Sequence, residues 1–534
     1  MLNHTWGLNH VAHRPELEPV TKRKSLYVAL DKMPRMTKTK ILVDLKPAFD
    51  GFAGIPQETR LLFTGWRRLQ GLHTQGLIQH GGRRLRAALL PHHASLPESR
   101  RIFQLSKFVV SLNERPYSNV WENFAENVSR YVALNMLSTR TALGFSVPHS
   151  VFDARLFSDF VWRTFFDKTL SAAEKDGITL DDFMAVQPSR KQFHEVGLRS
   201  SSLRKVAHYP LLDTKGFDYF LAQTPFPGRV STGTQMIVRY HDAVPILMPH
   251  TIADKAFHQA THFQALRANI ESGALLSCIS EATRQDLLTV FPQAEKQTFV
   301  IHNMVSEEYF EDDVPRSLVA RLVRNRLAEM PEFKSKLGLD KQVEDEFEYL
   351  LIVSTIEPRK NHMLLVNAWE RLKYSTHPRL KLIVVGNMGW DQGPVIKAFK
   401  PWAEKGELFY LQNVPSQELR VLYQHALATV CPSVAEGFDY SGVEAMLCGC
   451  PVISSNIAVH REIYQDASEF FNPYSVDDAA RIMRGVVAVE NSDLRVALRA
   501  RGRRVAQLYL PKNILPKWAD YFESQKINSD GSDR

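Results

Sequence analysis

The second half of the chain alternates short apolar runs with amphipathic segments, and this alternation limits the possible folds. Five apolar runs rich in Leu, Ile and Val predict buried strands, at residues 349–353, 380–385, 408–411, 428–431 and 452–454. The segments between them carry apolar residues at helical spacing, as at residues 362–372. Strands that are each followed by a helix predict a parallel sheet covered on both faces, with ligands bound at the carboxyl ends of the strands.

The first half of the chain is less regular. Apolar runs predict four more strands, at residues 41–45, 236–240, 275–279 and 298–301, and helices dominate residues 120–185. Ser280 and Ser416 are predicted to cap the helices that follow them. Because 534 residues are too many for one ordinary hydrophobic core, we expect an α/β protein with two large domains.

The acidic, polar segment 340–348 predicts the connection between the two domains. The first domain is expected at residues 38–339, with a helical insertion, and the second at residues 340–500. Residues 501–534 predict a C-terminal helix and tail. Residues 1–37 are polar and lack the apolar core of a signal peptide, so we expect a mobile extension there or a misassigned start.

The composition argues against a membrane-spanning, disulfide-bonded or metal-binding protein. No apolar run is long enough to span a bilayer, and four cysteines in so long a chain give no disulfide framework. Cys448 and Cys450 flank one glycine, but no second ligand pair with zinc-like spacing follows, so packing at a helix end is the better interpretation. We expect a reduced, cytoplasmic protein without a metal site.

The net charge of +8 is unevenly spread. Residues 61–110 hold eight Lys and Arg against one acidic residue, Glu98, and basic clusters at 67–68 and 83–86 lie among large apolar residues. This stretch is either a solvated helical face or a surface for an anionic membrane or a phosphate-bearing acceptor. We expect no nucleic-acid partner, because neither a nucleic-acid motif nor a stacking pattern of aromatic and basic residues is present.

Two glutamates eight positions apart, Glu436 and Glu444, lie where the strand at 428–431 gives way to a helix. Gly437 and Gly442 disfavour one continuous helix, so we expect Glu436 in the loop and Glu444 in the first turns of the helix. A helix N-terminus beside a loop carboxylate suits a nucleotide-diphosphate sugar, which has phosphate in its middle and hydroxyls at both ends. The alternative is a solvated acidic turn.

The stretch Glu436-Gly-Phe-Asp-Tyr-Ser-Gly-Val-Glu444 resembles the Glu-x7-Glu motif of the retaining glycosyltransferases of family 4. Further segments resemble the same family: Glu-Pro-Arg-Lys-Asn at 357–361, Val-Gly-Asn-Met-Gly-Trp at 385–390 and His-Asp-Ala-Val-Pro at 241–245. The resemblance implies the GT-B fold, in which two Rossmann-like domains face a central cleft. It is strong over residues 349–483, moderate over 236–310 and loose over 41–64.

The resemblance also implies roles for the matching residues. Glu436 would contact the donor sugar and Glu444 the ribose. Arg359 and Lys360 would hold the donor phosphates, and His241 would hydrogen-bond a donor hydroxyl or phosphate. Catalysis would then rest on stabilisation of the leaving group, without a metal.

Five further positions complete the predicted donor site: Gly386, Phe438, Ser441, Gly442 and Gly54. The sequence departs from the family pattern in three places. Ser354 replaces a glycine, and residues 439–442 read Asp-Tyr-Ser-Gly where Gly-Leu-Pro is commoner. Residues 54–57 read Gly-Ile-Pro-Gln in place of Gly-Ile-Gly-Arg, and Pro56 removes one backbone N–H donor.

The sequence thus predicts a retaining glycosyltransferase in surface polysaccharide synthesis, cytoplasmic or peripheral at the cytoplasmic face of the membrane. Its substrates would be a nucleotide-diphosphate sugar, carrying mannose or a related hexose, and a glycan or lipid-linked acceptor; no further cofactor is expected. Two alternatives remain. One is a sugar-nucleotide epimerase of similar architecture, although no epimerase acid/base set is recognisable. The other is a non-enzymatic protein that binds a membrane surface through the basic stretch.

Overall fold

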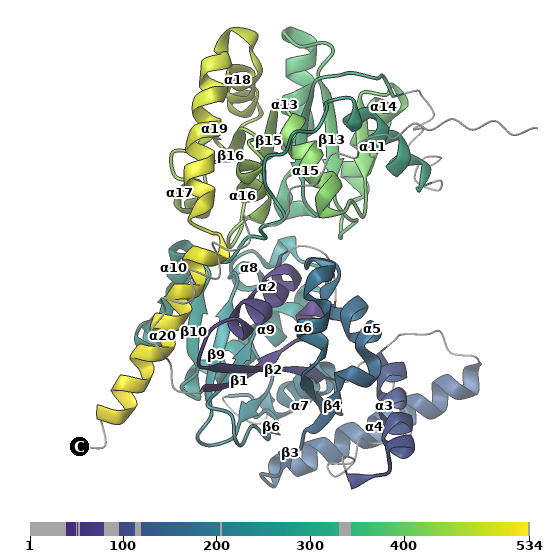
Figure 1. Ribbon diagram of the computed structural model, residues 1–534, viewed down its shortest axis with the longest axis vertical. Helices are drawn as coiled ribbons and strands as arrows, with labels where there is room; N and C mark the ends of the chain where they lie inside the picture. Colours follow the sequence, from purple (N-terminus) through teal and green to yellow (C-terminus); the bar gives the residue numbers. More distant parts are fainter. Residues whose placement is uncertain are drawn as a thin grey trace, which may run out of the picture.

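The computed structural model describes residues 39–49, 51, 54–79, 95–112, 119–202, 206–330 and 343–531. It forms two α/β lobes stacked along the long axis of the molecule, each built on a mainly parallel sheet (Figure 1). The predicted α/β fold with two Rossmann-like domains is confirmed.

The first lobe contains an eight-stranded sheet in the order β11-β10-β9-β7-β1-β2-β5-β4, parallel except for the edge strand β4. Its strands are β1 (Thr39–Asp44), β2 (Leu72–Gln79), β4 (Ser150–Asp153), β5 (Asp182–Val186), β7 (Tyr219–Ala222), β9 (Gln235–Tyr240), β10 (Leu275–Cys278) and β11 (Thr298–Val300). A small second sheet joins β3 (Ser146–Val147), β6 (Leu211–Leu212) and β8 (Arg229–Val230). The four strands predicted here are present within one or two residues.

The helices of this lobe are α2 (Ile55–Arg67), α3 (Glu98–Leu112), α4 (Val120–Ala142), α5 (Ser158–Val161), α6 (Lys175–Thr179), α7 (Arg190–Ser201), α8 (Val244–Leu247), α9 (Lys255–Glu271) and α10 (Glu281–Val290). Residues 120–185 are only partly helical, because β3, β4 and β5 also lie there. Ser280 caps α10 as predicted, since its side chain accepts a hydrogen bond from the backbone N–H of Thr283.

The second lobe contains a fully parallel six-stranded sheet in the order β14-β13-β12-β15-β16-β17. Its strands are β12 (Tyr349–Val353), β13 (Lys381–Val385), β14 (Leu408–Leu411), β15 (Ala428–Cys431), β16 (Val452–Ser455) and β17 (Ser468–Phe471). Its helices are α11 (Leu318–Ala328), α13 (His362–Ser375), α14 (Gly393–Glu404), α15 (Ser416–His425), α16 (Tyr440–Leu447), α17 (Ala458–Tyr464), α18 (Val476–Val487) and α19 (Ser492–Gln507). The prediction that Ser416 caps α15 is wrong: the helix already includes this serine, and Pro415 holds the cap position.

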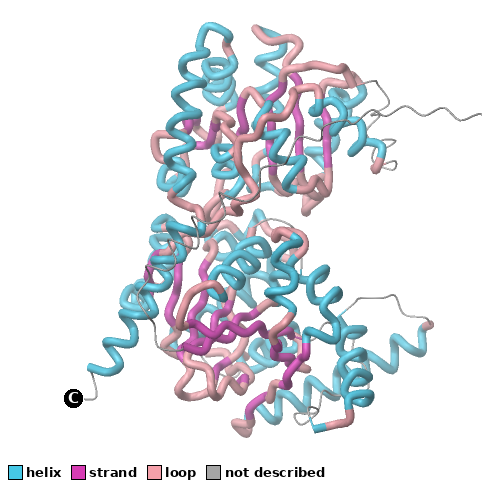
Figure 2. The backbone as a smooth tube through the Cα atoms, viewed as in Figure 1, coloured by secondary structure: helices cyan, strands magenta, loops and turns pink. Residues whose placement is uncertain are grey.

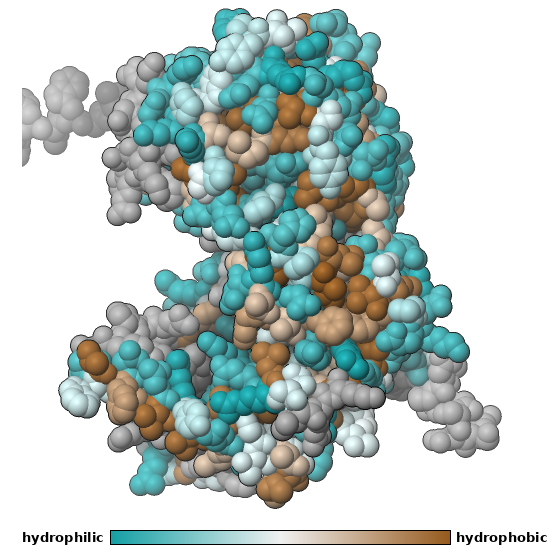
Figure 3. Space-filling view, turned by 180° about the vertical axis from the view of Figure 1, so that it is seen from behind, coloured by the Kyte–Doolittle hydropathy of each residue, from teal (hydrophilic) through white to brown (hydrophobic). Residues whose placement is uncertain are grey.

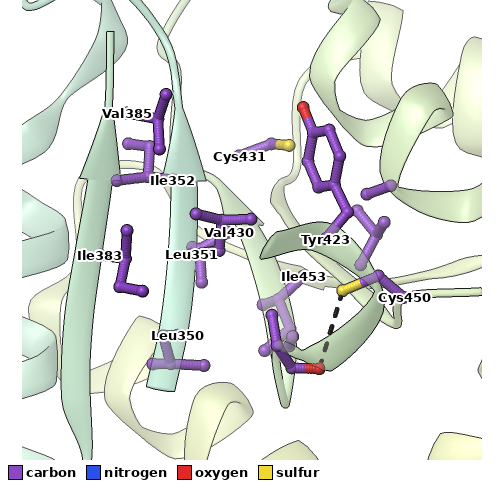
Figure 4. Close-up of a cluster of buried hydrophobic side chains, with 14 of the residues drawn as sticks. Leu350, Leu351, Ile352, Ile383, Val385, Tyr423, Val430, Cys431, Cys450 and Ile453 are labelled. Carbon is purple, nitrogen blue, oxygen red and sulfur yellow. Dashed lines mark hydrogen bonds between the residues drawn. The ribbon is translucent and has the colours of Figure 1, made fainter. Parts of the chain in front are cut away.

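Branched aliphatic side chains fill the centre of the second sheet (Figure 4). Leu350 and Ile383 are fully buried on neighbouring strands, as parallel strands covered on both faces require. Cys448 and Cys450 are buried free thiols next to the end of α16. The Cys450 thiol lies 3.3 Å from the Thr429 hydroxyl (the dashed line in Figure 4), so these cysteines pack as the sequence indicated.

The chain crosses between the lobes twice. After β11 it enters the second lobe, where α11 packs against α15 and β14. After α19 it returns along α20 (Pro511–Gly531), the long helix that descends beside the first lobe (Figure 2). We therefore propose that the second domain begins before Leu318, in place of the predicted boundary at residue 340. Residues 343–348 lead directly into β12, so we propose that they belong to the second domain rather than to the connection.

The basic stretch 61–110 does not form one amphipathic helix. It completes α2, passes through the inner strand β2 and enters α3. Arg67 pairs with Asp181 and Arg68 with Glu174, both at 2.5 Å. The basic cluster at 83–86 lies outside the described residues. None of the helices in the described ranges is long and apolar enough to cross a bilayer.

Candidate active site in the cleft

A cavity of about 450 Å³ lies between the two lobes, lined by residues that follow β1, β9, β12, β13 and β15. The predicted residues that line it are Gly54, His241, Arg359, Lys360, Gly386, Glu436, Phe438, Ser441 and Glu444. Gly442 is not part of the lining. A side chain at Gly442 would meet the Tyr464 ring at 2.3 Å, so this glycine serves the packing of α16 rather than a ligand.

Glu436 lies in the loop after β15 and is surrounded by donors. Arg359 donates to its Oε2 at 2.7 Å, Ser433 donates to its Oε1 at 2.6 Å, and the Lys360 ammonium binds the same Oε1. Burial alone would raise the pKa of Glu436, but Arg359 and Lys360 outweigh burial and lower it. The carboxylate is therefore ionised, and it concentrates two cations at the centre of the cleft.

The two cations come from a tight turn after β12. Residues Pro358–Lys360 form a 3₁₀ turn, which ends at Asn361 with a φ of 58°. The Asn361 side chain donates to the carbonyls of Pro432 and Pro473 and thereby ties the turn to neighbouring loops. Asparagine tolerates this left-handed conformation better than most residues. The turn fixes where Arg359 and Lys360 point.

Glu444 lies inside α16 in a very different electrostatic setting. Gln57 donates to its Oε1 at 3.0 Å, and the hydroxyls of Tyr423 (3.2 Å) and Tyr309 are further donors. Within the described chain these donors are all uncharged. Burial raises the pKa of Glu444 to about 7, although the hydrogen bonds oppose this shift. The pKa values of the two glutamates of the motif are thus shifted in opposite directions.

The N-terminus of α16 faces the cavity beside Glu436. Its cap residue, Asp439, has a φ of 61° and occupies the position where glycine is commoner. His460 lies 3.1 Å from its Oδ2, and the Ser441 hydroxyl donates to its Oδ1 at 2.7 Å. Burial would raise the pKa of Asp439, but these bonds and Lys360 hold it well below its usual range. The buried pairing with His460 stabilises the strained cap.

Gly386 is required by the protein itself. A Cβ atom there would lie 2.0 Å from the carbonyl oxygen of Ser354, which follows the neighbouring strand. The sequence predicted close approach of a nucleotide at this position. The structure shows a close approach of two loops at the same position, in which Ser354 N–H donates to the carbonyl of Val385, while Gly386 also lines the cavity.

His241 and Asp242 are polar residues of the first lobe that line the cavity. Burial lowers the pKa of His241 to about 3, so its imidazole is neutral. None of the described residues hydrogen-bonds its Nε2. Burial raises the pKa of Asp242, although Arg359 across the cleft opposes that shift. The sequence motif predicted His241 as a site residue but did not predict Asp242, which directly follows it.

On the first-lobe side of the cavity, the buried Arg60 connects two segments of the chain through hydrogen bonds. Arg60 of α2 donates to the carbonyls of Ala48 (2.7 Å), Gly51 (2.8 Å) and Phe165 (2.7 Å), and to the Thr169 hydroxyl. These bonds join the loop after β1 to the segment at 165–169. Lys168, Thr169 and Gly54 line the cavity there. Sequence reasoning identified only Gly54, because residues 65–233 carry no recognisable motif.

Residues 338–505 match the family described as glycosyl transferases group 1. This match covers most of the second lobe and none of the first. It is 29% identical over 251 residues to O-antigen chain mannosyltransferase B of Escherichia coli, which covers 47% of this chain and 60% of the relative. It is 39% identical over 69 residues to O-antigen chain mannosyltransferase RfbU of Salmonella typhimurium, or 13% of this chain and 20% of the relative. The chain thus spans less than two thirds of these relatives.

The sucrose-phosphate synthase from Thermosynechococcus elongatus has a similar fold, with a TM-score of 0.50 and 15% sequence identity. The likeness covers 92% of this chain and 100% of that protein. The predicted GT-B arrangement is confirmed.

The structure brings cations, a helix N-terminus and two carboxylates into one cavity. Arg359 and Lys360 can neutralise a diphosphate, and the first N–H groups of α16 provide a second site for anions. Glu436 and Glu444 can accept hydrogen bonds from sugar hydroxyls at either end of such a ligand. In the described ranges no group of three or more His, Cys, Asp or Glu residues could hold a metal ion.

Proposed function

We propose that the protein transfers a hexose from a nucleotide-diphosphate donor to a hydroxyl of a glycan or lipid-linked acceptor, with retention at the anomeric carbon. The observation that carries this proposal is the convergence of Arg359 and Lys360 on Glu436, beside the N-terminus of α16. The arrangement suits a ligand with two negative charges next to a sugar. The two curated relatives named above are mannosyltransferases in O-antigen synthesis, which supports mannose and surface polysaccharide synthesis.

Each residue has a defined task in this proposal. Glu436 accepts hydrogen bonds from the donor sugar and keeps the two cations in place, while Glu444 accepts from the ribose. Arg359 and Lys360 stabilise the negative charge that develops on the departing diphosphate. Neutral His241 donates one ring N–H to the backbone carbonyl of Gln223, so its Nε2 accepts a hydrogen bond from a hydroxyl of the donor sugar. The departing phosphate accepts the proton of the acceptor hydroxyl.

The test is incubation of the purified protein with a panel of nucleotide sugars, with and without a mannose-terminated oligosaccharide. We expect transfer to the oligosaccharide or slow hydrolysis for one donor, and Lys360→Met should lower kcat at least about a hundredfold. Glu436→Gln should weaken both donor binding and turnover. Neither transfer nor hydrolysis with any donor, and no nucleoside diphosphate binding, would overturn the proposal. An epimerised nucleotide sugar formed without acceptor would establish the epimerase instead.

We also propose a peripheral contact with the cytoplasmic face of the membrane through α4. This helix exposes large apolar side chains over most of its length, at the end of the molecule where brown surface gathers in Figure 3: Val120, Trp121, Phe124, Val128, Tyr131, Val132 and Met136. Tryptophan and tyrosine with one polar edge suit the membrane–water interface. This surface replaces the basic stretch as the candidate membrane contact.

Vesicle flotation tests this contact. The full chain should float with vesicles, and the double variant Trp121→Ser/Phe124→Ser should remain in the soluble fraction. Tyr474→Ser, which changes an aromatic side chain that is 78% exposed on the other lobe, is the matched control. Equal flotation of the double variant and the wild type would exclude α4 as the contact.

A further inference from the structure

Two departures from the family pattern, at residues 54–57 and 439–442, meet across the cleft. The Gln57 amide in the first turn of α2 donates to Glu444 Oε1 at 3.0 Å. The hydroxyl of Tyr440, the first residue of α16, donates to Glu58 Oε2 at 2.9 Å. The commoner leucine at position 440 has no hydroxyl for this bond. The starts of α2 and α16 are thus joined by two buried hydrogen bonds between the domains.

The first-domain end of this connection is rigid. Glu58 Oε1 lies 3.1 Å from Arg239, and both side chains are almost completely buried. Arg239 also donates to the Ser277 hydroxyl at 2.8 Å and to the Ile301 carbonyl at 2.6 Å, which fixes it to β10 and the end of β11. Tyr440 therefore binds a carboxylate that is fixed to the first domain.

We propose that Gln57 and Tyr440 are positioning residues that couple the donor side of the cleft to its acceptor side, an inference that rests on the proposed function. Glu444, proposed to hold the ribose, is also the acceptor for Gln57. Gly54, Ile55 and Pro56, immediately before Gln57, line the opposite side of the cavity. A donor seated on α16 thus draws the start of α2 towards the reacting centre. Without these bonds the donor still binds the second domain, but α2 is not aligned.

The variants that test this inference are Tyr440→Phe and Gln57→Leu. The probes are the nucleotide sugar that the wild type hydrolyses fastest and the corresponding nucleoside diphosphate. We expect Tyr440→Phe to lower kcat for hydrolysis and transfer about tenfold, which corresponds to about 1.4 kcal/mol. The Kd for the nucleoside diphosphate should stay within about threefold, because its contacts within the second domain remain. Gln57→Leu should lower kcat similarly.

Tyr423→Phe is the matched comparison. Tyr423 also donates to Glu444, at 3.2 Å, but from α15 of the same domain. Its loss should weaken nucleoside diphosphate binding and leave the domain closure unchanged. X-ray scattering with saturating nucleoside diphosphate should show a larger radius of gyration for Tyr440→Phe and Gln57→Leu, and the wild-type value for Tyr423→Phe. This difference separates positioning from a general loss of structure.

The outcomes are distinct. Wild-type kcat in both cross-cleft variants would overturn the coupling while the transferase proposal stands. A wild-type protein that neither binds a nucleoside diphosphate nor hydrolyses any donor would overturn the proposed function itself. The Tyr440→Phe ring keeps its packing against Phe438, whose centroid lies 5.1 Å away, so the variant should fold. If one cross-cleft variant does not fold, the other decides.

Discussion

At the scale of single residues, the pKa values of the two glutamates of one motif are shifted in opposite directions. Glu436 is paired with two cations and is ionised, whereas Glu444 has uncharged donors and a pKa of about 7. A carboxylate that is buried without a cation costs folding free energy when it ionises. This cost agrees with the role proposed for Glu444, which is to bind a ligand rather than to stabilise the fold.

Glu444→Gln should stabilise the protein at high pH. The folded pKa of about 7 lies above the ordinary glutamate value of 4.5, so the stabilising contribution is complete below pH 4.5 and is lost as pH rises through 7. At pH 8.5 the ionised side chain costs up to about 3 kcal/mol relative to a neutral one. The thermal midpoint of the variant relative to wild type should be higher at pH 8.5 than at pH 5.5. A pH-independent difference would contradict the raised pKa.

At the scale of elements, hydrophobic patterning predicted most of the parallel strands, because strands buried on both faces are continuous apolar runs. The edge strand β17 was missed, since Ser-Glu-Phe-Phe at 468–471 has no such run. Strands of two residues, such as β3, carry no pattern at all. The candidate site was predicted where a recognisable motif follows a strand, as at Glu436 in the second lobe and at His241 in the first. Gln57 and Asp242 were missed because their contacts lie in the other domain.

Gly386→Ala should disrupt the edge of the second sheet. The new Cβ would lie 2.0 Å from the Ser354 carbonyl oxygen, so the loops after β12 and β13 must separate. We expect a loss of about 2 kcal/mol or more in stability and weaker nucleoside diphosphate binding. Thermal unfolding and calorimetry measure the two effects. Gly393→Ala is the control, because a Cβ there meets no atom within 4 Å; equal midpoints for the two variants would refute the close approach.

At the scale of the whole molecule, the last helix completes the first domain. The apolar side chains of α20 that are buried in its core are Ile514, Leu515, Trp518, Ala519 and Phe522. A Cβ at Gly65 of α2 would lie 2.7 Å from the Leu515 side chain, so this glycine makes room for α20. Sequence patterning could not reveal this packing, because the partners lie about 450 residues apart by the sequence numbering. The division into an N-terminal and a C-terminal half is therefore only approximate in space.

Trp518→Ala should destabilise the first domain although it lies near the end of the chain. The indole is fully buried against Trp66, with ring centroids 4.8 Å apart, and lies 5.4 Å from the guanidinium of Arg239. Large-to-small changes of buried aromatics cost about 3–5 kcal/mol. Because Arg239 anchors Glu58, the loss should also weaken the bond to Tyr440 and lower kcat. Urea unfolding followed by tryptophan fluorescence measures the first effect, with Tyr474→Ala as the exposed control. A wild-type midpoint for Trp518→Ala would mean that α20 does not dock on the first domain.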